Sequence, residues 1–211
     1  MKTKRIIILI LLIVGSITFM GQISNAQRSI QEQQYRQLRT DLREGTFTPE
    51  QVKGQGMAMA VDRVEGAQNI PDLTTKAVVI VRGVVINAET NGKTHVGSLP
   101  LLSTTYTVEI SEKIKGDVDT DTINVWQYGG NWKSLECTVT DDPNMVIGDE
   151  MILFLTCADG VYRTYGGPDG KYVIKEGKVY HISETIPGSQ YKNAELATNG
   201  IDYNSFIQQI K

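Results

Sequence analysis

Residues 77–86 read AVVIVRGVVI, and this stretch decides the fold class of the chain. Apolar β-branched residues dominate it, which is typical of a strand that is buried on both faces. Gly83 within the run predicts a bulge or a sharp bend of that strand. Residues 105–110, TYTVEI, then alternate between apolar and polar side chains, so they predict a second strand with one buried face.

Shorter runs with strand character follow, separated by turns that contain glycine. We expect these strands at 122–128, 135–140, 151–157, 161–165, 172–174 and 179–182. Residues 87–100 contain Asn91-Gly92 and are expected to form a loop. Short strands at this spacing are typical of a small antiparallel barrel or sandwich. Residues 202–211 predict a terminal helix that Asp202 caps and that docks through Phe206 and Ile210.

The N-terminus has the layout of a secretory signal peptide. Residues 1–5 are basic, residues 6–20 are almost entirely apolar, and residues 24–26 place small side chains before a cut at Gln27. The alternative is that this segment stays uncleaved and anchors an outward-facing protein in the membrane. The apolar run is shorter, however, than the roughly 20 residues that a spanning helix needs. We therefore expect a secreted protein.

The sequence divides into a signal peptide at 1–26, a helical N-terminal extension at 27–69 and a β domain at 70–211. Residues 28–44 contain no Gly or Pro and predict a helix, whereas residues 57–64 alternate weakly and could pair with the main sheet. The 211 residues carry a formal charge of −3 and no basic block. Cleavage changes this charge to −6, because it deletes Lys2, Lys4 and Arg5 and no acid. This balance gives no reason to expect nucleic-acid binding.

Three segments together resemble netrin-like modules, the family that includes the tissue inhibitors of metalloproteinases. They are AVVIVRGVV at 77–85, YTVEISEKIKG at 106–116 and VIGDEMILFL at 146–155. Uncharacterised secreted bacterial and archaeal domains are similar in addition at Gly129-Gly130 and at residues 166–173, GGPDGKYV. The resemblance covers roughly residues 70–182 and the last ten residues, and its motifs specify turns and core positions rather than chemistry.

The resemblance implies a mainly β fold, an OB-like antiparallel barrel with an N-terminal helical extension and a short C-terminal helix. One functional feature of the family does not carry over. The metalloproteinase inhibitors use an N-terminal Cys on the target's zinc, whereas the expected mature N-terminus here is Gln27.

Cys137 and Cys157 are the two cysteines of the chain. If residues 135–140 and 151–157 pair as a hairpin around Gly148, the two side chains lie nearly opposite each other. Disulfides form and persist in exported proteins, so we expect a disulfide between them. The alternative is two reduced, buried cysteines that pack as small apolar residues.

Trp126, Tyr128 and Trp132 cluster around Gly129 and Gly130. Aromatic side chains beside a glycine loop at a barrel rim can form a ligand platform, and these five residues are the candidate binding site. Further tyrosines could join the platform, namely Tyr162, Tyr165 and Tyr172. The alternative is that Trp126 or Tyr128 belongs to the core and that Trp132 covers a barrel end.

No pattern in the sequence indicates an enzyme, a metal site or a cofactor. The serines lack a G-x-S-x-G context, and neither His95 nor His181 has a second ligand at metal-binding spacing. The acidic run at 117–121 lacks the Gly and Glu that a calcium loop requires. We therefore expect an exported, non-catalytic binding module for an extracellular protein or small ligand. The alternatives are an envelope protein held by an uncleaved N-terminal helix and, more distantly, a hydrolase that uses Asp142 and Glu150.

Overall fold

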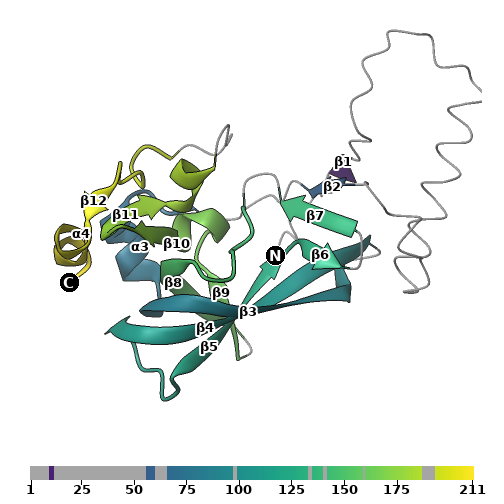
Figure 1. The fold of residues 1–211 in the computed structure, drawn as a ribbon, viewed down its shortest axis with the longest axis horizontal. Coiled ribbons are helices and arrows are strands. Elements are labelled where there is room, and N and C mark those ends of the chain that lie inside the picture. The colour runs from purple at the N-terminus through teal and green to yellow at the C-terminus, as the bar shows by residue number, and fades with distance from the viewer. Residues whose placement is uncertain are drawn as a thin grey trace, which may run out of the picture.

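The computed structural model describes residues 10–11, 56–59, 66–96, 99–132, 135–139, 142–158, 160–186 and 193–211. The strands are β1 (Ile10–Leu11), β2 (Gly56–Met59), β3 (Val79–Val96), β4 (Leu99–Lys115), β5 (Thr122–Tyr128), β6 (Gly130–Trp132), β7 (Leu135–Val139), β8 (Glu150–Ala158), β9 (Val161–Thr164), β10 (Lys171–Lys175), β11 (Lys178–His181) and β12 (Ile201–Asp202). The helices are α3 (Ile70–Lys76) and α4 (Tyr203–Ile210), and two 3-10 turns are η1 (Gly167–Gly170) and η2 (Ile182–Thr185). Figure 1 shows both helices at the same end of the sheet.

The described residues confirm a mainly β fold with a short C-terminal helix. The helix expected at 28–44 lies outside the described residues, as does the signal peptide apart from residues 10–11.

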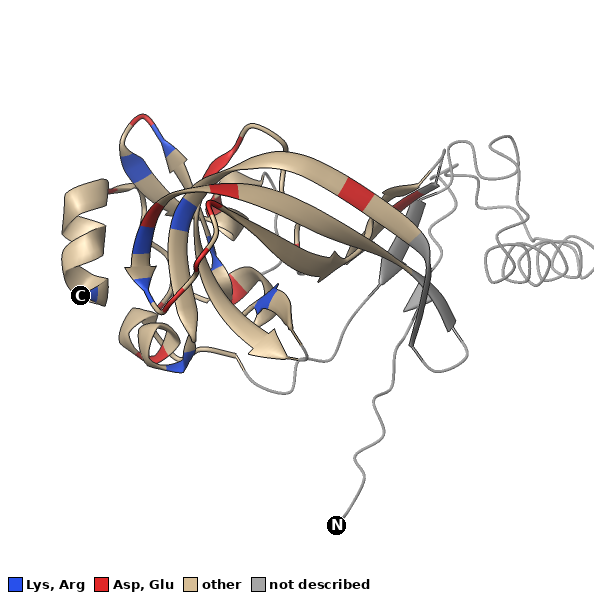
Figure 2. Ribbon diagram, turned by 90° about the horizontal axis from the view of Figure 1, so that it is seen from below, with Lys and Arg blue, Asp and Glu red and all other residues tan. Residues whose placement is uncertain are grey.

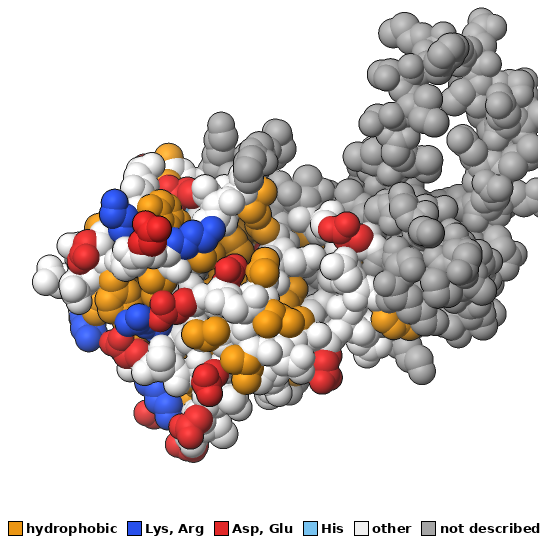
Figure 3. All heavy atoms as spheres, in the orientation of Figure 1, with side chains coloured by type: hydrophobic (Ala, Val, Ile, Leu, Met, Phe, Trp, Pro, Cys, Tyr) orange, Lys and Arg blue, Asp and Glu red, His pale blue; other side chains and the backbone are white. Residues whose placement is uncertain are grey.

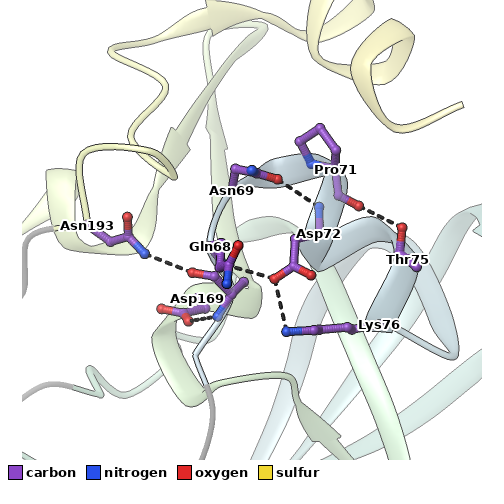
Figure 4. A network of polar contacts seen from close by, with 9 residues as sticks. Gln68, Asn69, Pro71, Asp72, Thr75, Lys76, Asp169 and Asn193 are labelled. Carbon is purple, nitrogen blue, oxygen red and sulfur yellow. Dashed lines mark hydrogen bonds and ion pairs between the residues drawn. The ribbon is translucent and has the colours of Figure 1, made fainter.

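The polar residues around its N-terminus fix α3 in place (Figure 4). Asn69 caps the helix, because its side chain accepts from the backbone N–H of Asp72 at 2.9 Å. The preceding chain is tied to distant segments: the Ala67 N–H donates to Asp169 at 2.7 Å, and Asn193 donates to the Ala67 carbonyl at 3.1 Å. The start of α3 is thereby anchored to η1 and to the segment at Asn193, which come about a hundred residues or more later in the chain.

β3 and β4 form a long hairpin at the centre of the larger sheet. Their register shifts between Arg82 and Gly83, which confirms the bulge predicted at this glycine. A Cβ at Gly83 would lie 2.3 Å from the carbonyl oxygen of Glu109, so glycine is needed for the close approach of the two strands.

The loop predicted at 87–100 is wrong, because β3 and β4 continue through most of it. Asn87 pairs with Thr107 and Asn91 with Ser103. The hydrogen bonds between the two strands join backbone N–H and C=O groups, so polar side chains such as those of Asn87 and Asn91 do not end the strand.

The larger sheet has eight strands in the order β12-β11-β10-β8-β3-β4-β5-β9. β9 also pairs with β8, so β8, β3, β4, β5 and β9 form a ring in which each strand pairs with two others of the ring, and β8 pairs with β10 in addition. The β5–β9 pairing is parallel and the other four pairings of the ring are antiparallel.

The two faces of the larger sheet bury separate apolar clusters. One lies against α3 and α4 and includes Ile80, Phe154, Tyr172 and Phe206. The other lies on the opposite face of β3 and β8 and extends across β4 and β5. Alternate residues of β3 and β8 therefore serve different cores, which explains why residues 77–86 read as apolar on both faces.

The smaller sheet has the order β1-β2-β7-β6. β7 pairs with β6 in antiparallel fashion and with β2 in parallel fashion. The hairpin predicted between 135–140 and 151–157 is therefore wrong, since β8 pairs with β3, β9 and β10 instead. Residues 56–59 likewise join this smaller sheet and not the main one.

The C-terminal helix α4 docks as predicted. Asp202 accepts hydrogen bonds from two backbone N–H groups of the first turn, at 2.9 and 3.3 Å. Phe206 is fully buried with its ring centroid 4.9 Å from that of Tyr172. The Arg82 guanidinium lies 4.3 Å from the ring centroid of Tyr203, so a cation–π contact also joins α4 to β3.

Candidate functional site

Trp126 and Tyr128 lie together on the face of β5 that points away from the ring interior. Ile123, Val125 and Gln127 alternate with them and are buried, whereas Trp126 and Tyr128 are half-buried. The two aromatic rings are 4.4 Å apart in an edge-to-face arrangement. The pair is therefore an exposed aromatic cluster and not part of either core.

Arg163 completes this cluster and was not anticipated from the sequence. Its guanidinium carbon lies 4.5 Å from the centroid of the Trp126 ring. β5 and β9 pair in parallel at Val125 and Tyr162, which brings the next residue of each strand, Trp126 and Arg163, to the same place. No local pattern in the sequence signals a contact between residues so far apart in the chain, because it depends on strand pairing alone.

The neighbouring strand β4 supplies neutral polar groups beside the aromatic pair. Thr105 lies opposite Trp126, and Thr107 lies opposite Asn124 and donates to its side chain at 3.1 Å. On the face that Figure 3 shows, Lys and Arg side chains lie among Asp and Glu in the left-hand part of the view, and Figure 2 likewise shows Lys and Arg only in the part of the molecule that carries the helices. The aromatic face thus combines apolar rings, one guanidinium and hydroxyl or amide groups.

Gly129 and Gly130 are buried, and both have positive φ angles of 94° and 124°. A Cβ at Gly129 would lie 2.8 Å from the Cys137 carbonyl oxygen, and one at Gly130 would lie 1.9 Å from the Thr104 hydroxyl. These glycines let the chain turn from β5 into β6 against other parts of the protein. Their role in this structure is packing, and the predicted contact with a ligand stays a prediction.

Trp132 is half-buried and lies in β6, in the smaller sheet, so it belongs to a different sheet from Trp126 and Tyr128. Tyr172 is fully buried, and it is a core residue that cannot join a surface platform. Tyr162 and Tyr165 are half-buried. Tyr165 packs against the apolar cluster beside the helices, and Tyr162 packs against the cluster on the opposite face.

Asp142 and Glu150, the acids of the distant hydrolase alternative, form ion pairs with different cations. Asp142 Oδ1 lies 2.6 Å from Lys171 Nζ, and Glu150 Oε1 lies 2.7 Å from Arg82 Nη2. Each carboxylate is thus engaged with its own cation, which does not favour a shared acid–base role.

The cysteines are both free thiols, Cys137 buried and Cys157 exposed. Cys137 lies in β7 of the smaller sheet and Cys157 in β8 of the larger one, so the cross-strand geometry on which the disulfide prediction depended is absent. Burial raises the pKa of the Cys137 thiol to about 12.

His181 is buried and has a structural role at the start of η2. Its Nδ1 lies 2.7 Å from the Ser183 hydroxyl, and its backbone N–H donates to Glu184 at 2.7 Å. Among the described residues, no group of three or more His, Cys, Asp or Glu side chains could hold a metal ion.

Comparison of the chain with protein-family models and with curated protein sequences gave no match. None of the helices in the described ranges has the length and apolar character needed to cross a membrane.

Proposed function

We propose that this chain is an exported, non-catalytic binding module built on an OB-like barrel, and that it binds its ligand on the outer face of β4 and β5. The strand ring supports the barrel. In chain order its five strands are β3, β4, β5, β8 and β9. Around the ring, β3 pairs with β4, β4 with β5, β5 with β9, β9 with β8, and β8 with β3, which is the order 1-2-3-5-4-1. OB-type barrels bind ligands on the face of their second and third strands.

The observation that carries the binding proposal is the cluster of Trp126, Tyr128 and Arg163 on the outer face of the third strand. Trp, Tyr and Arg are the residue types that contribute most to binding energy at protein interfaces. Here they lie next to each other, with ring centroids 4.4 Å apart and the guanidinium 4.5 Å from one ring. The neighbouring threonines and asparagine supply hydrogen-bonding groups without adding charge.

The ligand class that fits this face is neutral and carries apolar faces and hydroxyl or amide groups, such as an oligosaccharide or an extended peptide. The sequence has an excess of acidic residues and no basic block. A nucleic acid or an anionic membrane surface therefore gains little electrostatic attraction.

The test compares the wild-type chain with the double variant Trp126→Ala/Tyr128→Ala on printed arrays of oligosaccharides and of peptides. We expect spots that the wild type binds and that the double variant loses, by at least tenfold in apparent affinity. Thr122→Ala is the matched control, because Thr122 is an exposed residue of the same strand β5 that makes no part of the aromatic cluster.

Circular dichroism and thermal unfolding establish that each variant is folded. Array binding that persists in a folded double variant would contradict this face as the binding surface. Loss of binding in the Thr122→Ala control as well would show that the effect is not specific to the aromatic cluster.

A further inference from the structure

Lys171 is a charged residue with a fully buried side chain, 0% exposed. Its Nζ lies 2.6 Å from Asp142 Oδ1 and 2.9 Å from the Pro143 carbonyl oxygen. The Asp142 side chain is only 13% exposed. This lysine and this carboxyl group therefore meet where little water reaches.

Both partners are held from several sides. Lys171 begins β10 opposite Leu153 of β8, which fixes its backbone. The Asp142 N–H donates to the Val139 carbonyl at 3.0 Å. The Gln127 side-chain amide donates to the carbonyl of Asp142 at 3.0 Å. Two groups fixed in contact in this way react as if they were at very high concentration.

The contact also permits the proton transfer that amide formation requires. Nζ must lose a proton, and the Asp142 carboxylate, 2.6 Å away, is placed to accept it. A neutral amine is a nucleophile, and a neutral carboxylic acid is the form that it attacks. Exclusion of water disfavours the reverse hydrolysis.

We propose that Lys171 and Asp142 condense to an intramolecular amide bond, which cross-links β10 to the segment that precedes β8. Nζ of the neutral amine attacks Cγ of the carboxylic acid, and a C–N bond forms. The C–O bond to the hydroxyl group then breaks, and this oxygen leaves as water with a proton from the nitrogen. The chain loses one water molecule, and no group is oxidised or reduced.

An exposed pair in the same protein provides an internal control. Lys76 Nζ lies 3.0 Å from Asp72, but the two side chains are 34% and 25% exposed. Water solvates both charges there, so both groups stay ionised and we expect no condensation.

The decisive measurement is a tryptic digest of the full purified chain, unfolded and reduced, analysed by tandem mass spectrometry. An acylated Lys171 resists trypsin, so the cross-link joins residues 134–163 to residues 164–175 in one branched peptide. Its mass is expected to equal the sum of the two linear peptides minus one water, while cleavage after Lys76 proceeds normally. Recovery of the linear peptides 134–163 and 164–171, with no branched peptide, would overturn the proposal.

Two variants test the chemistry. Asp142→Asn should give the same amide with loss of ammonia, so its branched peptide is expected to have the same mass as that of the wild type. Lys171→Arg keeps the positive charge but has no amine to acylate, so it should give only linear peptides. If either variant fails to fold, the wild-type digest decides the question by itself.

Discussion

Cys137 and Cys157 differ in their exposure to solvent, and this difference predicts their reactivity. The thiolate is the nucleophilic form, and burial raises the pKa of Cys137 to about 12, whereas Cys157 is exposed. In native protein purified without reductant, iodoacetamide should modify Cys157 readily and Cys137 only after unfolding. Mass spectrometry of the intact chain should show one adduct before unfolding and two after it.

The variant Cys157→Ser is expected to take no adduct in the native state, and Cys137→Ser is expected to take one adduct in the native state, like the wild type, and no second one after unfolding. A native wild-type chain that takes no adduct until a reductant is added would instead show that the two thiols are oxidised. This experiment separates the free thiols of the structure from the disulfide predicted from the sequence.

Gly129 and Gly148 have nearly the same φ, 94° and 95°, but different surroundings. A Cβ at Gly129 would lie 2.8 Å from the Cys137 carbonyl oxygen, whereas nothing lies within 4 Å of one at Gly148. Gly148→Ala should therefore cost only the backbone strain, about 1–3 kcal/mol. Gly129→Ala should cost roughly 1–3 kcal/mol more, because the added methyl group overpacks the turn.

Denaturant unfolding curves of the two variants measure this difference directly. Equal losses of unfolding free energy would mean that β7 moves away from Gly129 at no cost. The turn from β5 into β6 would then not depend on the close approach of the chain to Cys137.

At the scale of elements, Glu184 connects η2 to the segment before α4. Its carboxylate accepts from the backbone N–H groups of His181, Thr198 and Asn199 at 2.7, 3.1 and 2.8 Å. Burial by itself would raise the pKa of Glu184, but these hydrogen bonds outweigh that effect and lower the pKa below its ordinary value of 4.5.

A lowered pKa in the folded state has a defined sign for stability. The contribution of Glu184 is fully present above the ordinary pKa and is lost as the pH falls through the lower folded value. Because Glu184 is exposed and water screens its charge, Glu184→Gln should lower the unfolding free energy at neutral pH by only about 0.5–1 kcal/mol, and it should show a weaker loss of stability in acid than the wild type. Thermal unfolding measured across this pH range tests both expectations.

Glu195→Gln provides the control, since Glu195 is an exposed glutamate of the neighbouring segment. Its acid unfolding profile should follow that of the wild type. An unchanged profile for Glu184→Gln would mean that the carboxylate does not hold the two segments together.

Local sequence signals located most elements well. α4, the strands β5 and β8, the middle of β4 and the bulge at Gly83 follow from a capping residue, alternation and a glycine within an apolar run. The signal failed between 87 and 100, where Asn and Thr residues continue β3. Turn-type side chains there did not indicate a turn, because the long hairpin is held by backbone hydrogen bonds to the opposite strand.

At the scale of the whole molecule, pairing between distant strands created the main features of the candidate site. Trp126 and Tyr128 could be chosen from the sequence because they are aromatic and two residues apart. Arg163 joined them only through the parallel pairing of β5 with β9. The ion pair of Lys171 with Asp142 likewise joins β10 to the segment before β8, and no spacing along the chain predicts it.

The mainly β class, the positions of most strands and the C-terminal helix follow from the sequence, since they depend on periodicity and capping within short windows. The signal peptide and export stay predictions from the N-terminal residues. Two features are visible in the folded chain alone. β7 and β8 lie in different sheets, which separates Cys137 from Cys157, and β9 completes the ring. Strand partners are chosen by the burial of whole faces and by chain connectivity, and these properties are not present in any single segment.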